Sequence, residues 1–93
     1  MSKENSKEVY IGDKSIPSYL SACFYALGQD NEIVLIARGN NVKRAIDIAA
    51  ILIRQYLDNP KYSVVIGSEK FKDRNVSTIE ITLTGTKRDA EDK

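Results

Sequence analysis

Three positively charged side chains lie where the chain changes from a strand-like to a helix-like pattern. Arg38, Lys43 and Arg44 fall within the stretch ARGNNVKRA, which contains no acidic residue. The first N–H groups of a helix have no intrahelical partner and carry partial positive charge, so they donate to anions. Cations beside such a helix start predict a phosphate-binding site. The alternative is a solvated loop whose charges are incidental.

The segments on either side of this turn position the three cations. The apolar run IVLI predicts a strand over 32–37 that is covered on both faces. Gly39 permits a tight backbone turn, and Asn40 or Asn41 can cap the helix that follows. That second helix is expected over about 42–57.

The rest of the chain predicts one further helix and three further strands. Ser15 is a suitable cap for a first helix over about 17–27, and Gly28 is expected to end it. Its apolar face is formed by Tyr19, Leu20, Cys23, Phe24 and Leu27. Asn59 and Pro60 are expected to end the second helix, because the residue before a proline avoids the helical conformation. Strands are expected over 8–12, from about 61, and over 76–84.

This order of elements, β-α-β-α-β-β, predicts a single α+β domain in which two helices pack on a mixed four-stranded sheet. A hairpin between the last two strands is expected to protrude. The domain is expected over 8–86, with flexible polar tails at 1–7 and 87–93. No apolar stretch is long enough to span a membrane, and no secretory signal is expected.

The second helix carries more apolar residues than one buried face requires. Those expected to face the core are Val42, Ala45, Ile46, Ala49, Ile53, Tyr56 and Leu57. Those expected to extend this surface sideways are Ile48, Ile51 and Leu52. A helix that is apolar around most of its circumference buries more than one side. The second side is therefore expected to contact another subunit, the alternative being apolar residues scattered over the surface.

Three segments, in order along the chain, are similar to motifs of one family. Residues 36–47, IARGNNVKRAID, resemble the sequence K-A-R-G-x-x-I-x-K-A-V-D of the Alba family, small archaeal chromatin and RNA-binding proteins. Residues 10–14, followed by Tyr19, resemble the family's opening strand and its I-G-K-K-P-x-x-N-Y loop. Residues 76–81, VSTIEI, resemble its final strand. Together the three segments cover most of the chain.

The resemblance implies a non-enzymatic protein that binds double-stranded DNA, RNA or both, as a homodimer or as a heterodimer with a related chain. It implies coating and compaction of nucleic acid on the chromosome in the cytoplasm, with little sequence specificity, because phosphate contacts carry no sequence information. Tyr56, beside Leu57, matches an aromatic position that members use for contact between dimers; core packing is its alternative role. The nucleic-acid-binding residues expected are Lys14, Arg38, Asn40, Lys43, Arg44, Lys70, Lys72 and Arg74.

The segment GSEKFKDRN, residues 67–75, separates the last two strands. Lys70 and Lys72 are two residues apart, so in an extended strand they share a face, and Phe71 points the other way. By itself this segment is an ordinary solvated hairpin whose charges protect the edge of the sheet. The resemblance implies instead a flexible basic arm that follows a groove of a duplex, a few residues shorter than in typical members.

The chain departs from the family pattern at two positions. Asp13 stands where the family has the first of two adjacent lysines, and Asn40 stands where many members have another basic residue. The net charge is only +1, whereas nucleic-acid-binding proteins are usually more basic. Affinity depends on the local potential more than on the total charge. We therefore expect weaker or salt-sensitive binding, or a preference for RNA.

Several other functions lack the residues that they need. Histidine is absent, which removes the Ser-His and Cys-His nucleophile pairs and the commonest metal ligand. The single cysteine, Cys23, lies in an apolar helical pattern and is expected to be a buried, inert thiol. No catalytic residue, metal, cofactor or small-molecule substrate is expected. The runner-up function is an assembly protein or an RNA-processing accessory protein with weakened DNA binding.

Overall fold

The computed structural model describes residues 7–87 of the 93-residue chain. Its elements are, in chain order, β1 (Glu8–Tyr10), α1 (Ile16–Asp30), β2 (Glu32–Arg38), a 3₁₀ turn (Gly39–Asn41), α2 (Val42–Ile51), a π-helical turn (Leu52–Tyr56), β3 (Leu57–Phe71) and β4 (Arg74–Lys87). The tails expected at 1–7 and 87–93 lie, apart from Lys7 and Lys87, outside the described residues. Their flexibility therefore stays a prediction.

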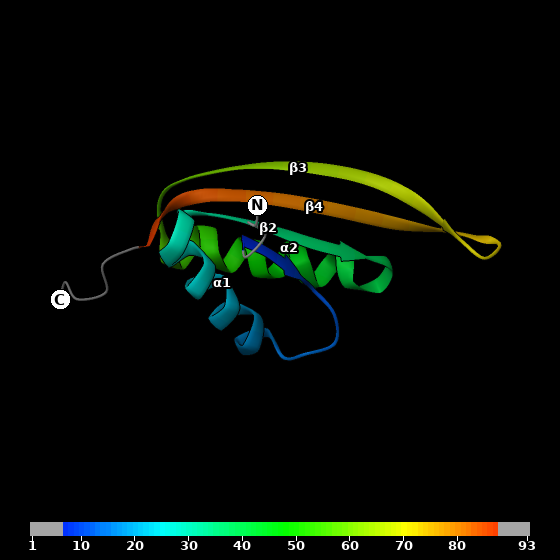
Figure 1. Ribbon diagram of the computed structural model, residues 1–93, viewed down its shortest axis with the longest axis horizontal. Helices are drawn as coiled ribbons and strands as arrows, with labels where there is room; N and C mark the ends of the chain where they lie inside the picture. Colours follow the sequence, from blue (N-terminus) through cyan, green and yellow to red (C-terminus); the bar gives the residue numbers. More distant parts are fainter. Residues whose placement is uncertain (1–6, 88–93) are drawn as a thin grey trace.

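The strands form one mixed sheet in the order β1-β2-β4-β3. β1 is parallel to β2, and β4 is antiparallel to both of its neighbours. Both helices lie against one face of this sheet, and the other face is open (Figure 1). The predicted α+β architecture of two helices on a mixed four-stranded sheet is therefore confirmed.

β2 alternates between a buried side and a partly exposed side. Ile33, Leu35 and Ala37 point toward the helices and are buried, whereas Val34 and Ile36 lie on the open face and are half-buried. The expectation that both faces of this strand are covered is therefore wrong for this chain. The two helices cover only one face of the sheet, and sheets with antiparallel pairs commonly leave the other face in water.

A single core lies between the sheet and the two helices. Its largest members are aliphatic side chains, each of which stabilises the fold by about 1.5–3 kcal/mol when fully buried. Those with almost no exposed surface are Leu27, Ile33, Leu35, Ile48, Leu52, Leu57 and Leu83. Among the residues that the structure describes, no polar or charged residue is buried. The charged side chains among the described residues therefore lie at or near the surface.

The first helix begins as expected but ends later. The Ser15 hydroxyl accepts a hydrogen bond from the Ser18 N–H, with 3.4 Å between the two heavy atoms, which confirms the predicted cap. Gly28 does not end the helix, which continues past it. The helix ends at Asn31, whose φ is 58° and whose N–H donates to the Leu27 carbonyl at 2.9 Å. Asparagine tolerates this left-handed conformation, so it can close a helix as glycine does.

The second helical segment consists of α2 and the π-helical turn that follows it. It ends at Tyr56, and Leu57 already begins β3. The expectation that Asn59 and Pro60 end the helix is therefore wrong. They lie inside β3, at a shift in its register against β4, and Asn59 has a left-handed φ of 52°. β3 is an edge strand of the sheet, and a proline is tolerated at a bulge in such a strand.

The apolar faces of α2 and the turn after it differ from the expected assignment. Ile48 and Leu52 have no exposed surface and lie in the core, whereas Ile46 is 47% exposed and Tyr56 is 37% exposed. A helix that is apolar on most sides can turn any of several faces inward. Its packing on the sheet therefore decides which residues face the core. Ile46 therefore lies on the exposed apolar side of the helix, and Ile48 lies on the side that faces the core.

β3 and β4 pair beyond the ends of the helices and project as a hairpin (Figure 1). This projection makes the molecule 53 Å long, against 30 and 22 Å in the other two directions. Lys72 and Asp73 alone form the turn, because Phe71 already pairs with Arg74. All side chains from 61 to 75 are exposed.

Cys23 should be chemically protected in the folded protein. It has no exposed surface, and burial raises the pKa of its thiol to about 12. The native thiol should therefore resist a disulfide reagent at about pH 9, where an unfolded thiol is largely ionised and reacts quickly. Because only the neutral thiol suits the core, the free energy of unfolding should fall as pH rises from about 9 to 12, and Cys23→Ala should remove this component. Rapid labelling of native protein would contradict the assigned burial.

Candidate functional site

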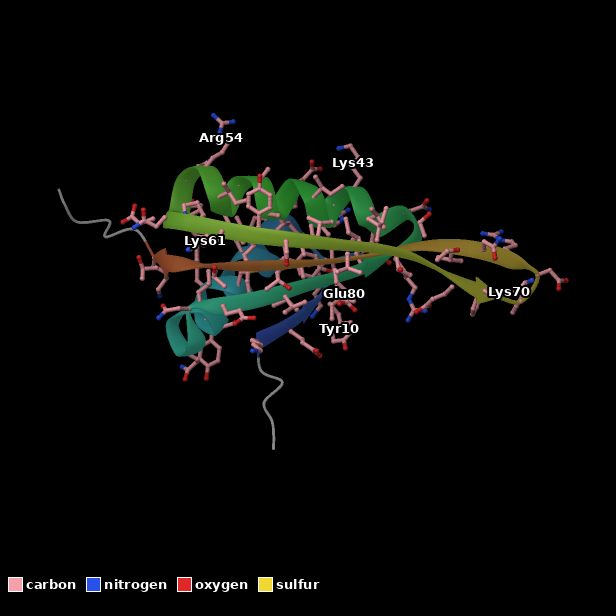
Figure 2. All side chains as sticks on the ribbon, turned by 90° about the horizontal axis from the view of Figure 1, so that it is seen from above. Tyr10, Lys43, Arg54, Lys61, Lys70 and Glu80 are labelled. Carbon is pink, nitrogen blue, oxygen red and sulfur yellow. The ribbon has the colours of Figure 1, made fainter. Side chains whose placement is uncertain are left out.

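Four cationic side chains lie at the end of the molecule from which the hairpin projects. Lys14 lies in the loop after β1, Arg38 ends β2, and Lys43 and Arg44 lie in the first turn of α2. The end of β2 and the start of α2 both lie on this side (Figure 1). Lys43 projects from the half of α2 nearer the hairpin in Figure 2. The fold therefore brings the four cations to one end of the domain, with Arg38 on the open-face side of the sheet and Lys43 and Arg44 on α2.

Lys14 and Arg44 are connected through the loop after β1. The Arg44 guanidinium donates to the Lys14 carbonyl, with 3.3 Å between the two heavy atoms. The Tyr19 hydroxyl accepts hydrogen bonds from the N–H groups of Gly12 and Lys14 at 2.7 and 3.0 Å. From the sequence, Tyr19 is expected on the apolar face of the first helix and resembles the tyrosine of the family's loop motif, but its hydroxyl is assigned no hydrogen bond. The signal for its second role is that a buried tyrosine hydroxyl needs a hydrogen-bond partner.

The turn between β2 and α2 leaves its backbone amides uncapped. Gly39 has a φ of 62°, and a Cβ there would find room, so the residue is required for its conformation and not for space. Asn41, in the cap position of α2, has helical angles of −86° and −5°. Its side chain makes no capping hydrogen bond, so the expectation of an asparagine cap is wrong. Capping needs an extended backbone, and the 3₁₀ turn Gly39–Asn41, which includes Asn41, prevents it.

Two of the four cations are paired with carboxylates in the free protein. Arg38 Nη1 lies 3.1 Å from Glu69 Oε1 of β3, and Lys43 Nζ lies 3.0 Å from Asp47 Oδ2 one turn along α2. The Arg38 and Glu69 side chains are 67% and 57% exposed, and exposed ion pairs contribute only about 0–1 kcal/mol. A phosphate group can therefore replace either carboxylate. No local pattern indicates the first pair, because its members are 31 residues apart.

Asn40 is exposed beside these cations. It lines a shallow depression of about 280 Å³, together with Lys43, Arg44 and Asp47. Its amide can donate a hydrogen bond to a phosphate oxygen but adds no charge. Asp13 is exposed in the loop after β1 and brings a negative charge to the same end of the molecule.

Several carboxylates lie on the open face of the sheet. Tyr10 and Glu80 lie together on this face in Figure 2, although they come from β1 and β4. The Tyr10 hydroxyl donates to Glu8 at 3.2 Å, and this hydrogen bond, followed by the negative charges of Glu8 and Glu80, raises the pKa of Tyr10. Glu8, Glu69 and Glu80 line one depression on this face, and Arg38, which pairs with Glu69, lies at the same depression. A polyanion is therefore repelled from the middle of the sheet and favoured at the hairpin end.

The hairpin carries the other predicted cations, Lys70, Lys72 and Arg74, all of them exposed. The expectation that Lys70 and Lys72 share a strand face is wrong, because Lys72 lies in the turn with a φ of 59°. This left-handed conformation costs a residue with a Cβ about 1–2 kcal/mol. The Lys72 ammonium lies 5.6 Å from the centroid of the Phe71 ring. Lys70 and Arg74 lie on opposite faces of the ribbon, since Arg74 pairs with Phe71 and adjacent strand residues alternate.

Tyr56 and Leu57 lie at the end of the second helical segment. The Tyr56 ring packs edge-on against Phe24, with 4.8 Å between ring centroids, and keeps 37% of its surface exposed. Leu57 has no exposed surface. A fully buried side chain cannot touch a second molecule without a rearrangement, so of these two residues only Tyr56 is available for a contact between dimers.

Among residues 7–87, no helix is long and apolar enough to cross a membrane. The same residues contain no group of three or more histidine, cysteine, aspartate or glutamate side chains arranged to hold a metal ion. The groups at the hairpin end that can bind a ligand include cations, backbone amides and an asparagine side chain, beside the carboxylates of Asp13, Asp47 and Glu69. Cations and backbone amides bind anions.

A family model for Alba matches residues 7–84 of the chain. The chain belongs to the Alba family. It is similar to the DNA/RNA-binding protein Alba of Nitrosopumilus maritimus, with 36% identity over 91 residues that cover 89% of this chain and 95% of that protein. It is also similar to the DNA/RNA-binding protein Alba of Nanoarchaeum equitans, with 38% identity over 85 residues that cover 82% and 94%.

Solved Alba structures share the fold. Alba from Thermoplasma volcanium superposes with a TM-score of 0.75 at 29% identity, over 83% of this chain and 98% of that one. ALBA1 from Trypanosoma brucei superposes with a TM-score of 0.76 over 90% and 73%, and at 17% identity this likeness concerns the fold alone. The Alba resemblance inferred from the three sequence motifs is therefore confirmed.

Replacing Tyr19 with phenylalanine should loosen the loop that carries Lys14. The substitution leaves two backbone N–H groups without their acceptor, which should lower the free energy of unfolding by about 1–3 kcal/mol. Hydrogen exchange at the Gly12 and Lys14 amides should accelerate. Tyr25→Phe is the matched control, because Tyr25 is 69% exposed, and it should change neither quantity. Equal behaviour of the two variants would mean that Tyr19 acts only as core packing.

Proposed function

We propose that this protein binds nucleic acid through the phosphate backbone and performs no catalysis. The observation that carries the proposal is the placement of Lys14, Arg38, Lys43 and Arg44 at one end of the domain, around the turn from β2 to α2. The Alba proteins of 36% and 38% identity, named as DNA/RNA-binding, support it. Backbone contacts carry no sequence information, so binding should depend little on sequence.

In this proposal the contacts at the hairpin end divide into three groups. Lys14 and Arg44, held together by the hydrogen bond between them, neutralise neighbouring phosphates. The amides of Gly39–Asn41, with the Asn40 side chain, donate to phosphate oxygens as helix starts commonly do. The cations of the hairpin, Lys70, Lys72 and Arg74, extend the contact along the same duplex.

Arg38 must exchange one partner for another when nucleic acid binds. In the free protein its guanidinium holds Glu69, and a phosphate would take the place of that carboxylate. Arginine can bind phosphate through two parallel hydrogen bonds, whereas Arg38 holds Glu69 through one hydrogen bond of 3.1 Å, so the exchange can favour the complex. Glu69 nevertheless competes for the same cation, and with Asp13 it accounts for the weak or salt-sensitive binding expected from the sequence.

The proposal includes a dimer, formed with a second copy or with a related chain. Side chains of the second helical segment, β3 and β4 line an apolar groove of about 340 Å³: Ile46, Ala49, Ala50, Ile53, Tyr62, Val64, Ile79 and Ile81. Tyr62 and Val64 are 62% and 49% exposed, although they lie on the face that the helices cover elsewhere. Contiguous exposed apolar surface of this kind marks an interaction site.

Coating and compaction require that such dimers also contact one another along nucleic acid. Tyr56 offers an exposed aromatic edge that Phe24 holds in place, which suits a contact of this kind. A chain that covers DNA in this way would be found on the chromosome in the cytoplasm. These roles follow from the proposed binding mode and need tests of their own.

Replacing Arg38 and Arg44 together with alanine should weaken binding to duplex DNA and duplex RNA alike. Removing one neutralised phosphate reduces the slope of log affinity against log salt concentration by about 0.9 on B-form DNA. The double variant should therefore show a slope smaller by about 1.8. Fluorescence anisotropy across a salt titration measures both quantities, and circular dichroism checks that the fold is retained.

The matched control removes two positive charges from the opposite end. Arg54 and Lys61 lie far from the hairpin tip, and replacing both with alanine should leave the salt slope nearly unchanged (Figure 2). Glu69→Gln tests the same site in the other direction, because it releases Arg38 and should raise affinity. Equal losses in the two double variants would show that total charge, and not this site, governs binding.

Replacing Ile46 with aspartate should convert the dimer to a monomer. Ile46 lies in the apolar groove and is 47% exposed in the single chain, so the change places a charge at the proposed interface while sparing the core. Sedimentation velocity at micromolar concentration should show the dimer for the unmodified protein and the monomer for this variant. Ser21→Asp, at an exposed position of α1, is the control and should stay dimeric. A monomeric unmodified protein would refute the proposed dimer.

A further inference from the structure

The tip of the hairpin presents an aromatic side chain at the point farthest from the core. Phe71 is the last residue of β3 and is 58% exposed. The hairpin extends beyond both helices (Figure 1). The ring is therefore available to a ligand that meets the end of the hairpin.

Lys72, next to this ring, keeps a conformation that most residues avoid. Its φ is 59° in a two-residue turn, a position where glycine or asparagine is the usual residue. The chain nevertheless has a lysine there, and its ammonium lies 5.6 Å from the centroid of the Phe71 ring. Backbone strain of this kind often accompanies a functional requirement. The pair suggests a ligand that accepts both an apolar ring and a positive charge.

The charges around the tip indicate the shape of that ligand. Lys70 lies on one face of the ribbon and Arg74 on the other, with Lys72 between them in the turn. A ribbon with cations on both faces suits a groove that has a phosphate backbone along each wall. Glu69, two residues from Phe71, contacts Arg38 of the phosphate site, so the tip is continuous with the surface proposed to hold nucleic acid.

We propose that Phe71 inserts between two base pairs of duplex DNA, so that this protein bends DNA as well as binding it. Apolar side chains that enter DNA in this way come from the minor groove, partly unstack one base step and kink the duplex toward the major groove. Lys70, Lys72 and Arg74 contact the phosphates on either side of that step. The inference rests on the proposed nucleic-acid binding and adds to it a deformation of the DNA.

A weak sequence preference follows from this mechanism. Steps of a pyrimidine followed by a purine, such as TA, unstack more easily than A-tract steps. Phe71 should therefore insert at TA steps without any hydrogen bond to a base edge. Duplex RNA has a wide, shallow minor groove that does not present the same site, so insertion should be specific to DNA.

The test uses the full chain with a short DNA duplex that carries 2-aminopurine at a central TA step. Binding of the unmodified protein should raise the fluorescence of this base, which reports unstacking, and should increase energy transfer between dyes at the two duplex ends, which reports bending. Phe71→Ala should still bind, with a smaller loss of affinity than the double arginine variant, but should abolish both signals. Phe71→Leu keeps an apolar wedge and should retain much of both.

Several outcomes would overturn the inference. Binding by the unmodified protein without either signal, or signals that persist in Phe71→Ala, would show that the ring is not inserted. A change of oligomeric state in Phe71→Ala would show that the tip contacts another copy instead. Binding to anionic lipid vesicles that depends on Phe71, with no unstacking of DNA, would assign the tip to a membrane surface. Failure of the unmodified protein to bind any duplex would instead refute the proposed function.

Discussion

The pairing of β4 with both of its neighbours is the constraint on which the rest of this structure depends. β4 (Arg74–Lys87) is twice as long as β2 (Glu32–Arg38), so its first residues have only β3 as a partner and project as the hairpin. The same register sets Arg38 opposite Thr78 and brings Glu69 of β3 within 3.1 Å of the Arg38 guanidinium. The pair Arg38–Glu69 therefore connects the hairpin directly to the cationic end of the domain.

The low net charge of +1 conceals a separation of charge. Carboxylates such as Glu8 and Glu80 lie on the open face of the sheet, while cations gather where β2 ends and α2 begins. A polyanion responds to this local field and not to the total. Since these charges are exposed, salt screens them efficiently, which makes ionic strength the variable that should control binding.

The surplus of apolar surface has a simple geometric origin. Two helices cover one face of the sheet as far as β4, but β3 runs past them, and Tyr62, Val64 and Ile66 are left exposed on the helix-covered side. Ile46 on α2 borders the same region. In the proposed dimer a second chain would cover this surface, and the assembly would then present two hairpins and two cationic ends to one duplex.

Short-range signals in the sequence determined the elements, their order and the set of cations. The IVLI run, the Ser15 cap and the turn at Gly39 all predicted the structure that formed locally. The tertiary structure decided three other things: which side of α2 faces inward, the bulge at Asn59 and Pro60, and the partners of Arg38 and of the Tyr19 hydroxyl. A helix that is apolar on most sides has no preferred inward face of its own. Contacts between residues far apart in the chain depend on strand register, which no local pattern contains.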